Sequence, residues 1–342
     1  MVLIHDQSGI EGLRKRAALQ PHGLKRFRNA FLKKGLSCES ALAVLPEDAR
    51  ALFEREVCFH SLKLSHRQDS KVDGATKLGF LSEDGHMVES VILRVQSGRT
   101  SLCISSQVGC ACACGFCATG QMGLTRNLTY AEILDQVVQA NQLLREEGRS
   151  VRNVVFMGMG EPFMNQEHLF RALEILTDPL SFDYAGSRLM VSTVGIPDVM
   201  LRCAREFPEV RQALSLHSAR QDVRETLIPL AKKYHLDLLR EALLAAGADG
   251  ELMVEYLMLA GINDREEDLL ALESYLRDCS VHINIVPYNA FDGCAWQGTP
   301  PAAREAFANR LKAAGFKVTQ RYSLGADIAA ACGQLASLHR QA

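Results

Sequence analysis

The stretch CISSQVGCACACGFCATG, residues 103–120, contains five of the eleven cysteines of the chain within fifteen positions. Three of them, Cys110, Cys114 and Cys117, form the pattern C-x3-C-x2-C. Three thiolates this close in one loop can hold one face of a metal centre. A structural zinc site is closed by four ligands, and an electron-transfer iron–sulfur cluster usually has four cysteines. A set of three therefore predicts a cluster with one iron open to a further ligand or a substrate.

Two alternatives remain open for this loop. Cys112 could complete a four-cysteine set, or the thiolates could bind zinc together with a distant histidine. We prefer three ligands, because Cys112 is too near both neighbours to reach a fourth corner without straining the loop. Cys112 is then expected to be a bystander thiol in a position for a small residue.

The composition is that of an ordinary globular protein: 342 residues, 47 % of them hydrophobic, with a formal charge of −2. This balance gives no general attraction to nucleic acid, so any such binding must be local. The sequence has no apolar run long enough for a membrane helix, and its start, MVLIHDQSG, is unlike a signal peptide. We therefore expect a cytoplasmic protein without membrane contact. In that reducing compartment, clustered cysteines indicate metal ligands or catalytic thiols.

Three regions follow one another along the chain. Residues 1–70 are expected to form a small helical domain, with a helix in LKRFRNAFLKKG that ends at Gly35 and another in PEDARALFEREV that begins at Pro46. Residues 71–98 are expected to form a β-hairpin linker that turns at Asp84-Gly85. Residues 99–342 form the core in this prediction.

The core sequence alternates strand-like and helical stretches. We expect helix starts at Thr129 with Glu132 and at Asp222 with Glu225. Alternation of this kind predicts a parallel sheet, either open and doubly wound or closed into a full or partial barrel. The expected strands are RNVVFMG (152–158), RLMVST (188–193), RQALSLH (211–217), ELMVEYLML (251–259), VHINIVP (281–287) and FKVTQRY (316–322).

Polar and glycine-rich residues follow these strands. In parallel sheets, the loops at the carboxyl ends of the strands converge, and the chemistry gathers there. Gly158-Met-Gly160-Glu161-Pro162, Ser192-Thr193, Ser215-Leu216-His217 and Pro287-Tyr-Asn289 all occupy such positions. Each is weak alone, since Gly-Met-Gly-Glu could be a tight turn and His217 a core histidine.

The motifs together resemble the RlmN/Cfr family of radical S-adenosylmethionine (SAM) RNA adenine methyltransferases. The resemblance is carried in order by CISSQVGC, the cage, CATG, RNLT, GMGEP, VST, SLHS, PLAKKY, VPYN and DIAAACGQLA (327–336). It implies a partial (βα)6 barrel preceded by the small helical domain. It also implies one [4Fe–4S] cluster on Cys110, Cys114 and Cys117, and two SAM molecules per turnover. The residues that match SAM-binding positions are Gly160, Glu161, Ser192, Ser215, Leu216, His217 and Asn289.

The resemblance assigns catalytic roles to three further residues. Cys332 matches the cysteine that is methylated during the reaction and carries the methyl group. Cys103 matches a second thiol that releases the product by forming a transient disulfide with Cys332. Glu89 matches the proton acceptor, with Cys103 as an alternative acceptor. Without the family, Glu89 would be taken for an exposed hairpin carboxylate.

The implied substrate is an unpaired or extruded adenosine in 23S rRNA, with tRNA as a further substrate. The basic N-terminal module, with Arg220, Lys232 and Lys233, would contact phosphates. Pro162 favours methylation at carbon 2, whereas Leu324 and Ala326 depart from the usual carbon-2 pattern; carbon 8 is the runner-up.

A zinc-containing RNA-binding protein and a radical enzyme acting on a small molecule are the alternatives from other classes. A flavodoxin or ferredoxin electron donor and a monomeric state complete the expectation.

Overall fold

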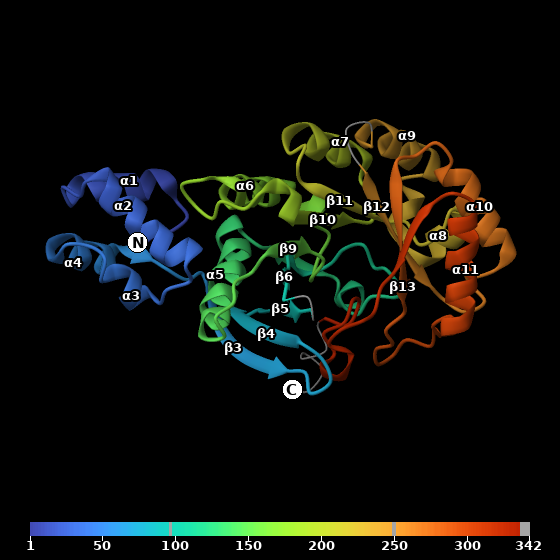
Figure 1. The fold of residues 1–342 in the computed structure, drawn as a ribbon, viewed down its shortest axis with the longest axis horizontal. Coiled ribbons are helices and arrows are strands. Elements are labelled where there is room, and N and C mark those ends of the chain that lie inside the picture. The colour runs from blue at the N-terminus through green and yellow to red at the C-terminus, as the bar shows by residue number, and fades with distance from the viewer. Residues whose placement is uncertain (96–97, 248–250, 336–342) are drawn as a thin grey trace.

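The computed structural model describes residues 1–95, 98–247 and 251–335, so that Ala336 of the last motif lies outside the described residues. Its centre is a ten-stranded sheet with the order β14-β13-β12-β11-β10-β9-β6-β5-β4-β3. Figure 1 shows this sheet running from the antiparallel strands at the bottom of the view to β13 at the right, with the helical N-terminal module at the left end.

Seven strands of the sheet pair in parallel, and helices connect them. The strands are β6 (Thr100–Cys103), β9 (Asn153–Phe156), β10 (Leu189–Thr193), β11 (Arg211–Ser215), β12 (Leu252–Met258), β13 (Val281–Pro287) and β14 (Lys317–Gln320). The connecting helices are α5 (Tyr130–Glu146), α6 (Gln166–Thr177), α7 (Pro197–Glu206), α8 (Gln221–Leu227), α9 (Leu236–Ala246), α10 (Glu266–Leu276) and α11 (Pro301–Ala313). The six strands predicted from the sequence are confirmed, and β6 is an additional one. The sequence of β6, TSLC, begins with two hydroxyl side chains and has no long apolar run to mark it as a strand.

The predicted partial barrel is confirmed in this arrangement: β6 and β9–β13 form the six-stranded parallel unit, and β14 extends it. Inside the curved sheet, Met190, Ala213 and Met253 form an apolar cluster, and Val155 and Met157 pack against it. Polar side chains lie at and beyond the carboxyl ends of the same strands. The apolar cluster therefore forms the floor of the cavity that holds the site.

Three antiparallel strands continue the sheet on the other side of β6. They are β3 (Leu62–Asp69), β4 (Ala75–Ser82) and β5 (Met87–Arg94), and β5 pairs directly with β6. The predicted turn at Asp84-Gly85 is confirmed, with Gly85 at a φ of 83°. β3 was not predicted, and it lies within the segment expected to be helical. The hairpin is thus part of the main sheet.

The N-terminal module consists of short helices around an aromatic core. It contains α1 (Gln7–Arg16), α2 (Pro21–Arg28), a π-helical turn (Asn29–Lys33), α3 (Cys38–Leu42), α4 (Glu47–Glu56) and a two-stranded parallel ladder of β1 (Val2–Leu3) with β2 (Val57–Cys58). The rings of Phe27, Phe31, Phe53 and Phe59 pack edge to face. A hydrogen bond of 2.8 Å between His60 Nδ1 and the buried Asp135 carboxylate on α5 fastens the module to the core.

The two predicted helix starts have different outcomes. Thr129 and Glu132 form a reciprocal capping box at the start of α5, as predicted. The start at Asp222 is wrong, because α8 begins at Gln221 and Arg220 occupies its N-cap position. The Ser218 hydroxyl accepts a hydrogen bond from the Arg220 amide at 3.0 Å, and this local turn begins the helix earlier than the sequence pattern indicates.

Candidate active site

The cysteine loop is fixed by a close contact between two glycines. It follows β7 (Gln107–Gly109), which pairs antiparallel with β8 (Leu124–Asn127). A Cβ atom on Gly109 would lie 1.9 Å from the carbonyl oxygen of Gly123, and Gly109 has a φ of 77°. The Cys110 amide donates to the same carbonyl oxygen at 2.8 Å. Only glycine fits at position 109, so the first predicted ligand starts from a well-defined position.

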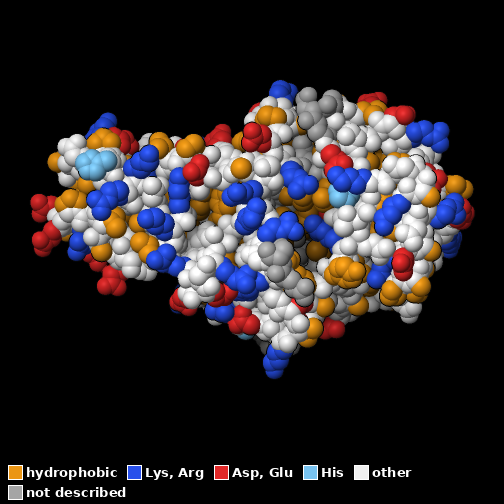
Figure 2. Space-filling view, viewed as in Figure 1, with side chains coloured by type: hydrophobic (Ala, Val, Ile, Leu, Met, Phe, Trp, Pro, Cys, Tyr) orange, Lys and Arg blue, Asp and Glu red, His pale blue; other side chains and the backbone are white. Residues whose placement is uncertain are grey.

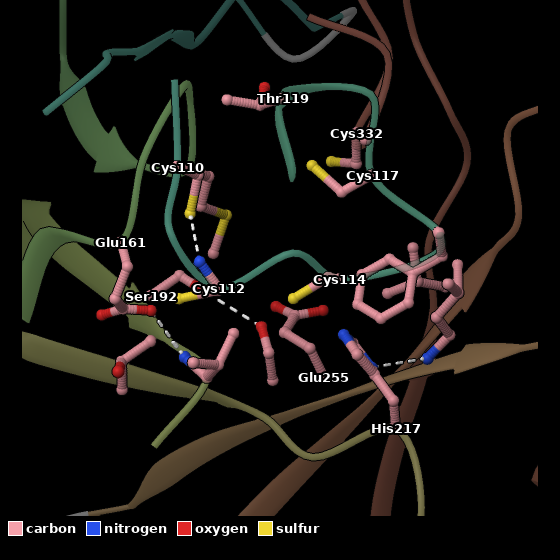
Figure 3. Close-up of a pocket in the computed structure, with 18 of the residues that line it drawn as sticks. Cys110, Cys112, Cys114, Cys117, Thr119, Glu161, Ser192, His217, Glu255 and Cys332 are labelled. Atoms are coloured by element: carbon pink, nitrogen blue, oxygen red, sulfur yellow. Dashed lines mark hydrogen bonds between the residues drawn. The ribbon is translucent and has the colours of Figure 1, made fainter. Parts of the chain in front are cut away.

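The structure brings the three predicted ligands to one pocket. Cys110, Cys114 and Cys117 line its wall, together with Cys112 (Figure 3). A hydrogen bond between the Cys110 and Cys112 thiols lowers the pKa of Cys110 and raises that of Cys112.

The donor set fits a cluster better than a single ion. A single zinc ion needs ligands that converge on one point, and no group of three His, Cys, Asp or Glu side chains does so in the described ranges. In an iron–sulfur cluster each thiolate binds a different iron, so separated thiols in one loop suit it. Burial raises the pKa of the Cys114 and Cys117 thiols, so a positively charged group is needed to hold them as thiolates.

Glu161 lies in the loop that follows β9 and lines the same pocket as the cysteine loop. Its carboxylate accepts hydrogen bonds from the amides of Val194 at 2.8 Å and Phe163 at 3.0 Å. Burial raises its pKa to about 7. Gly160 precedes it at a φ of 100°, where a Cβ would lie 2.5 Å from the Gln107 side chain. Both residues line the pocket, where the glycine allows close approach of a ligand to the backbone.

The ends of β10 and β11 add hydroxyl and imidazole groups. Ser192 and Ser215 on these neighbouring strands both line the pocket, with their Oγ atoms 3.4 Å apart. His217 also lines it, at a φ of 57°; its Nδ1 accepts a hydrogen bond from the Leu257 amide, and its ring packs edge to face on Phe116. Burial lowers the pKa of His217 to about 3, so the imidazole is neutral. Leu216 differs, because its fully buried side chain packs in the main hydrophobic core.

Cys332 lies on the wall between this pocket and a second one. It lines both, whereas Cys103 lines only the second pocket. Figure 3 shows Cys332 beside Cys117. Asn289, predicted to bind SAM, donates to the Cys332 carbonyl oxygen at 3.1 Å and is not among the described residues that line the first pocket. Both of the predicted catalytic thiols are free, and burial raises the pKa of Cys103 to about 12.

Glu89 is buried, contrary to its appearance as a hairpin carboxylate. It lies on β5 two residues from Val91, which is paired with Cys103, so Glu89 and Cys103 are on the same face of the sheet. Its Oε1 is 3.8 Å from Nζ of Lys77, which is also buried. Glu89 is not among the described residues that line the two pockets.

Two site residues were missed by the sequence analysis. Glu255 on β12 lines the first pocket; Asn284 donates to its Oε1 at 3.1 Å, and its buried Oε2 has no hydrogen-bond partner in residues 1–95, 98–247 and 251–335. Arg321 lines both pockets, with Nη1 3.8 Å from Glu255 Oε1. The one signal for Glu255 was an acid in the middle of the apolar strand ELMVEYLML. Arg321 follows the short edge strand β14 and has no local signal.

A parallel sheet with three loop thiols and polar strand ends around one pocket is the arrangement of a radical SAM enzyme. The model of the Radical SAM superfamily matches residues 104–272. A crystal structure of a radical SAM methyltransferase from Sphaerobacter thermophilus superposes with a TM-score of 0.91 at 32 % identity, covering 98 % of this chain and 99 % of that one.

Relatives identify the particular family. A probable RNA methyltransferase of Rhodopirellula baltica is 49 % identical over 329 residues, covering 95 % of this chain and 85 % of the relative. The dual-specificity RNA methyltransferase RlmN of Desulfotalea psychrophila is 43 % identical over 274 residues, 78 % of this chain and 75 % of that protein. The chain belongs to the RlmN family of radical SAM RNA methyltransferases. Membership implies a [4Fe–4S] cluster and SAM.

No helix in the described part of the chain combines the length and the apolar character needed to cross a membrane.

Proposed function

We propose that this enzyme methylates carbon 2 of an adenosine in 23S rRNA, and also in tRNA, through a methyl group carried on Cys332. The observation that supports this proposal most directly is the position of Cys332 on the wall shared by two pockets. The first pocket contains the predicted cluster ligands and five of the seven predicted SAM-binding residues, without Leu216 and Asn289. The second contains Cys103 and receives the adenine in this proposal. A carrier between donor and acceptor has to face both.

The residues of the first pocket fit one cluster and one bound SAM molecule. In this proposal two SAM molecules are used per turnover, one after the other. Bound there, they would supply a methyl group for Cys332 and the radical that activates it. Cys110, Cys114 and Cys117 hold the cluster, and Glu161 in its ionised form attracts the SAM ammonium group. Ser192 and Ser215 hydrogen-bond to SAM oxygens. The neutral His217 places its ring against Phe116 and leaves Nε2 for the ligand.

Release of the product needs a proton acceptor and a second thiol. We assign the proton from the adenine ring carbon to Glu89, and the unpaired electron of the adduct would pass to the bound cluster. The Cys103 thiolate then attacks the Cys332 sulfur: the bond from Cys332 sulfur to the product carbon breaks, that carbon leaves with the electron pair and gains a proton, and a Cys103–Cys332 disulfide forms. A cellular dithiol returns the disulfide to two thiols. We place the reaction in the cytoplasm, where thiols are kept reduced, with flavodoxin or ferredoxin as electron donor and the enzyme as a monomer.

RNA binding is supported by the distribution of charge on one face. Figure 2 shows Lys and Arg side chains over the N-terminal module at the left and around a hollow near the centre. Several basic residues of the module are already held within the protein: Arg14 pairs with Glu11 at 2.7 Å, Arg16 with Glu56 at 2.6 Å and Lys33 with Asp183 at 2.9 Å. Arg220 pairs with Glu267. The exposed Lys15, Lys25, Arg26 and Lys34 are better candidates for phosphate contacts.

The decisive experiment is reaction of reconstituted enzyme with unmodified 23S rRNA and tRNA, followed by digestion and mass spectrometry of the nucleosides. 2-Methyladenosine is the expected product. 8-Methyladenosine would move the assignment to carbon 8. Stoichiometric zinc without iron, and no methylated nucleoside, would favour the RNA-binding alternative.

A further inference from the structure

The loop that carries Cys332 is fastened at its start by the turn between β3 and β4. The Gly325 amide donates to the Asp73 carboxylate at 2.8 Å. Asp327 accepts hydrogen bonds from the Ser70 hydroxyl at 2.8 Å and from the Lys71 amide at 3.0 Å. These contacts join segments more than 250 residues apart in sequence. The antiparallel strands are therefore a platform for the loop.

An apolar cluster lies beneath this fastening. It contains Ala75, Val91 and Cys103 from the sheet, with Ile328, Ala330 and Leu335 from the loop, and Leu324 packs against it. A Cβ on Gly325 would lie 3.1 Å from the Ala75 Cβ, so the backbone approaches β4 closely. Leu324, which departs from the family pattern, thus makes an apolar contact in this structure.

Lys77 lies in this contact region and is buried, with 2 % of its surface exposed. Its Nζ donates to the Ala329 carbonyl oxygen at 3.4 Å and is 3.8 Å from Glu89 Oε1. Lys77 is the register partner of Val91, and Val91 is the partner of Cys103, so the three side chains share one face. A buried ammonium group is costly unless it is paired, which argues for a specific role at this position. Burial lowers the pKa of Lys77, and the nearby Glu89 carboxylate offsets only part of this effect.

The backbone conformation of Ala329 also indicates that the hydrogen bond from Lys77 matters for the loop. It has a φ of 48°, in the left-handed region that is unfavourable for alanine. The hydrogen bond from Lys77 holds the carbonyl group of this strained residue, three positions before Cys332. A change at Lys77 is therefore expected to act on the path of the loop.

We propose that Lys77 is a positioning residue that joins the Cys332 loop to the Glu89 side chain, so that the methyl carrier and the proton acceptor form one unit. The roles of Cys332 and Glu89 in this inference rest on the proposed function. Lys77 itself need not touch RNA or SAM. It sets where Cys332 lies relative to Glu89.

The first test is hydrogen exchange in the protein without cluster, SAM or RNA, so it does not depend on activity. Lys77→Met should speed amide exchange in the loop 325–333 about tenfold, because the Ala329 carbonyl loses its donor. Lys77→Arg should keep exchange near wild type, since arginine retains charge and donors. Lys63→Met, at an exposed position on β3, is the matched control. If Lys77→Met does not fold, the double variant Lys77→Met/Glu89→Gln removes both buried charges and tests the same contact. Unchanged loop exchange in the folded variant overturns the proposal.

The second test is turnover of in vitro transcribed 23S rRNA and tRNA by reconstituted enzyme. Lys77→Met should lower kcat about 10- to 100-fold with little change in KM for RNA, because a displaced group loses its reactive alignment. Lys77→Arg should restore most of the rate. The combined loss in Lys77→Met/Glu89→Gln should be no larger than that of Glu89→Gln alone. If the loss of rate in the double variant equals the product of the two single losses, the link between the two residues is overturned. A wild-type enzyme that methylates neither Cys332 nor RNA would refute the proposed function, while loop exchange would still decide the role of Lys77.

Discussion

The backbone amide of Ala118 donates a hydrogen bond of 2.7 Å to the carbonyl oxygen of Gly333. These residues directly follow Cys117 and Cys332, the last predicted cluster ligand and the predicted methyl carrier. The Thr119 hydroxyl adds a second bond, to the Leu335 carbonyl oxygen at 3.0 Å. Two hydrogen bonds therefore join the cysteine loop directly to the C-terminal loop.

The thiols of the cysteine loop should differ in their importance for iron binding. Cys114→Ala should abolish binding of about four irons per chain after anaerobic reconstitution, because it removes one of three ligands. Cys112→Ala should keep the iron content and the visible absorbance of the cluster. Cys203→Ala, in the hydrophobic core, is the control for loss of a buried thiol. Equal iron loss in Cys112→Ala and Cys114→Ala would favour a four-cysteine site.

The two glycines that fix the loop provide a matched pair of variants. Both have positive φ, 77° at Gly109 and 70° at Gly123, but a Cβ at 109 meets the Gly123 carbonyl, whereas a Cβ at 123 meets nothing within 4 Å. Gly109→Ala should therefore lower iron content and destabilise the fold by about 1–3 kcal/mol more than Gly123→Ala. Urea unfolding and iron analysis measure both effects. Equal effects would show that the close contact does not control the loop.

Cys103 and Cys332 should differ in reactivity towards iodoacetamide. Burial raises the pKa of Cys103 to about 12, so at pH 8 only a very small fraction is the reactive thiolate. Loss of solvation raises the pKa of Cys332 as well, but Cys332 is exposed to the reagent and should therefore be labelled first. Mass spectrometry of the two peptides over time gives the rates, and the Cys103 rate should rise with pH up to about 12. Faster labelling of Cys103 would contradict the burial of its thiol.

Glu161 should make stability fall as the pH rises. Its pKa is raised from 4.5 to about 7, so the folded state binds more protons than the unfolded state between these values. The contribution of Glu161 to the free energy of unfolding is fully present below pH 4.5 and is lost as the pH rises to 7. The change is up to about 3 kcal/mol. Glu161→Gln should remove this decline in urea unfolding without cluster or SAM. His217 has the opposite trend, but it is common to both proteins and cancels in their difference.

Exposed basic residues of the N-terminal module should contribute to RNA affinity. Lys25→Glu/Arg26→Glu/Lys34→Glu should weaken binding of 23S rRNA fragments and reduce the salt slope by about one per lost phosphate contact. Lys312→Glu on α11, at the opposite end of the molecule in Figure 1, should leave both unchanged. Filter binding at several salt concentrations measures them. An unaltered slope in the triple variant would place the RNA elsewhere.

Much of the fold was predictable because its signals are local. Strand length, apolar composition and the Asp84-Gly85 turn located six parallel strands and the hairpin, and C-x3-C-x2-C selected three residues that line one pocket. β3 and β6 were missed, since β3 is largely exposed and β6, TSLC, has no long apolar run. Their place is fixed by pairing with β4, β5 and β9.

By itself, the sequence determined the thiol cage, the alternation of strands and helices, and the family resemblance. Only the tertiary structure decided that Glu89 is buried beside Lys77, that Asn289 holds the Cys332 loop, and that Glu255 and Arg321 belong to the site. The reason is physical: backbone preferences and periodicity act over a few residues, whereas these contacts join positions far apart in the chain. Such contacts depend on how the sheet curves and which faces it buries, and these are properties of the packed whole.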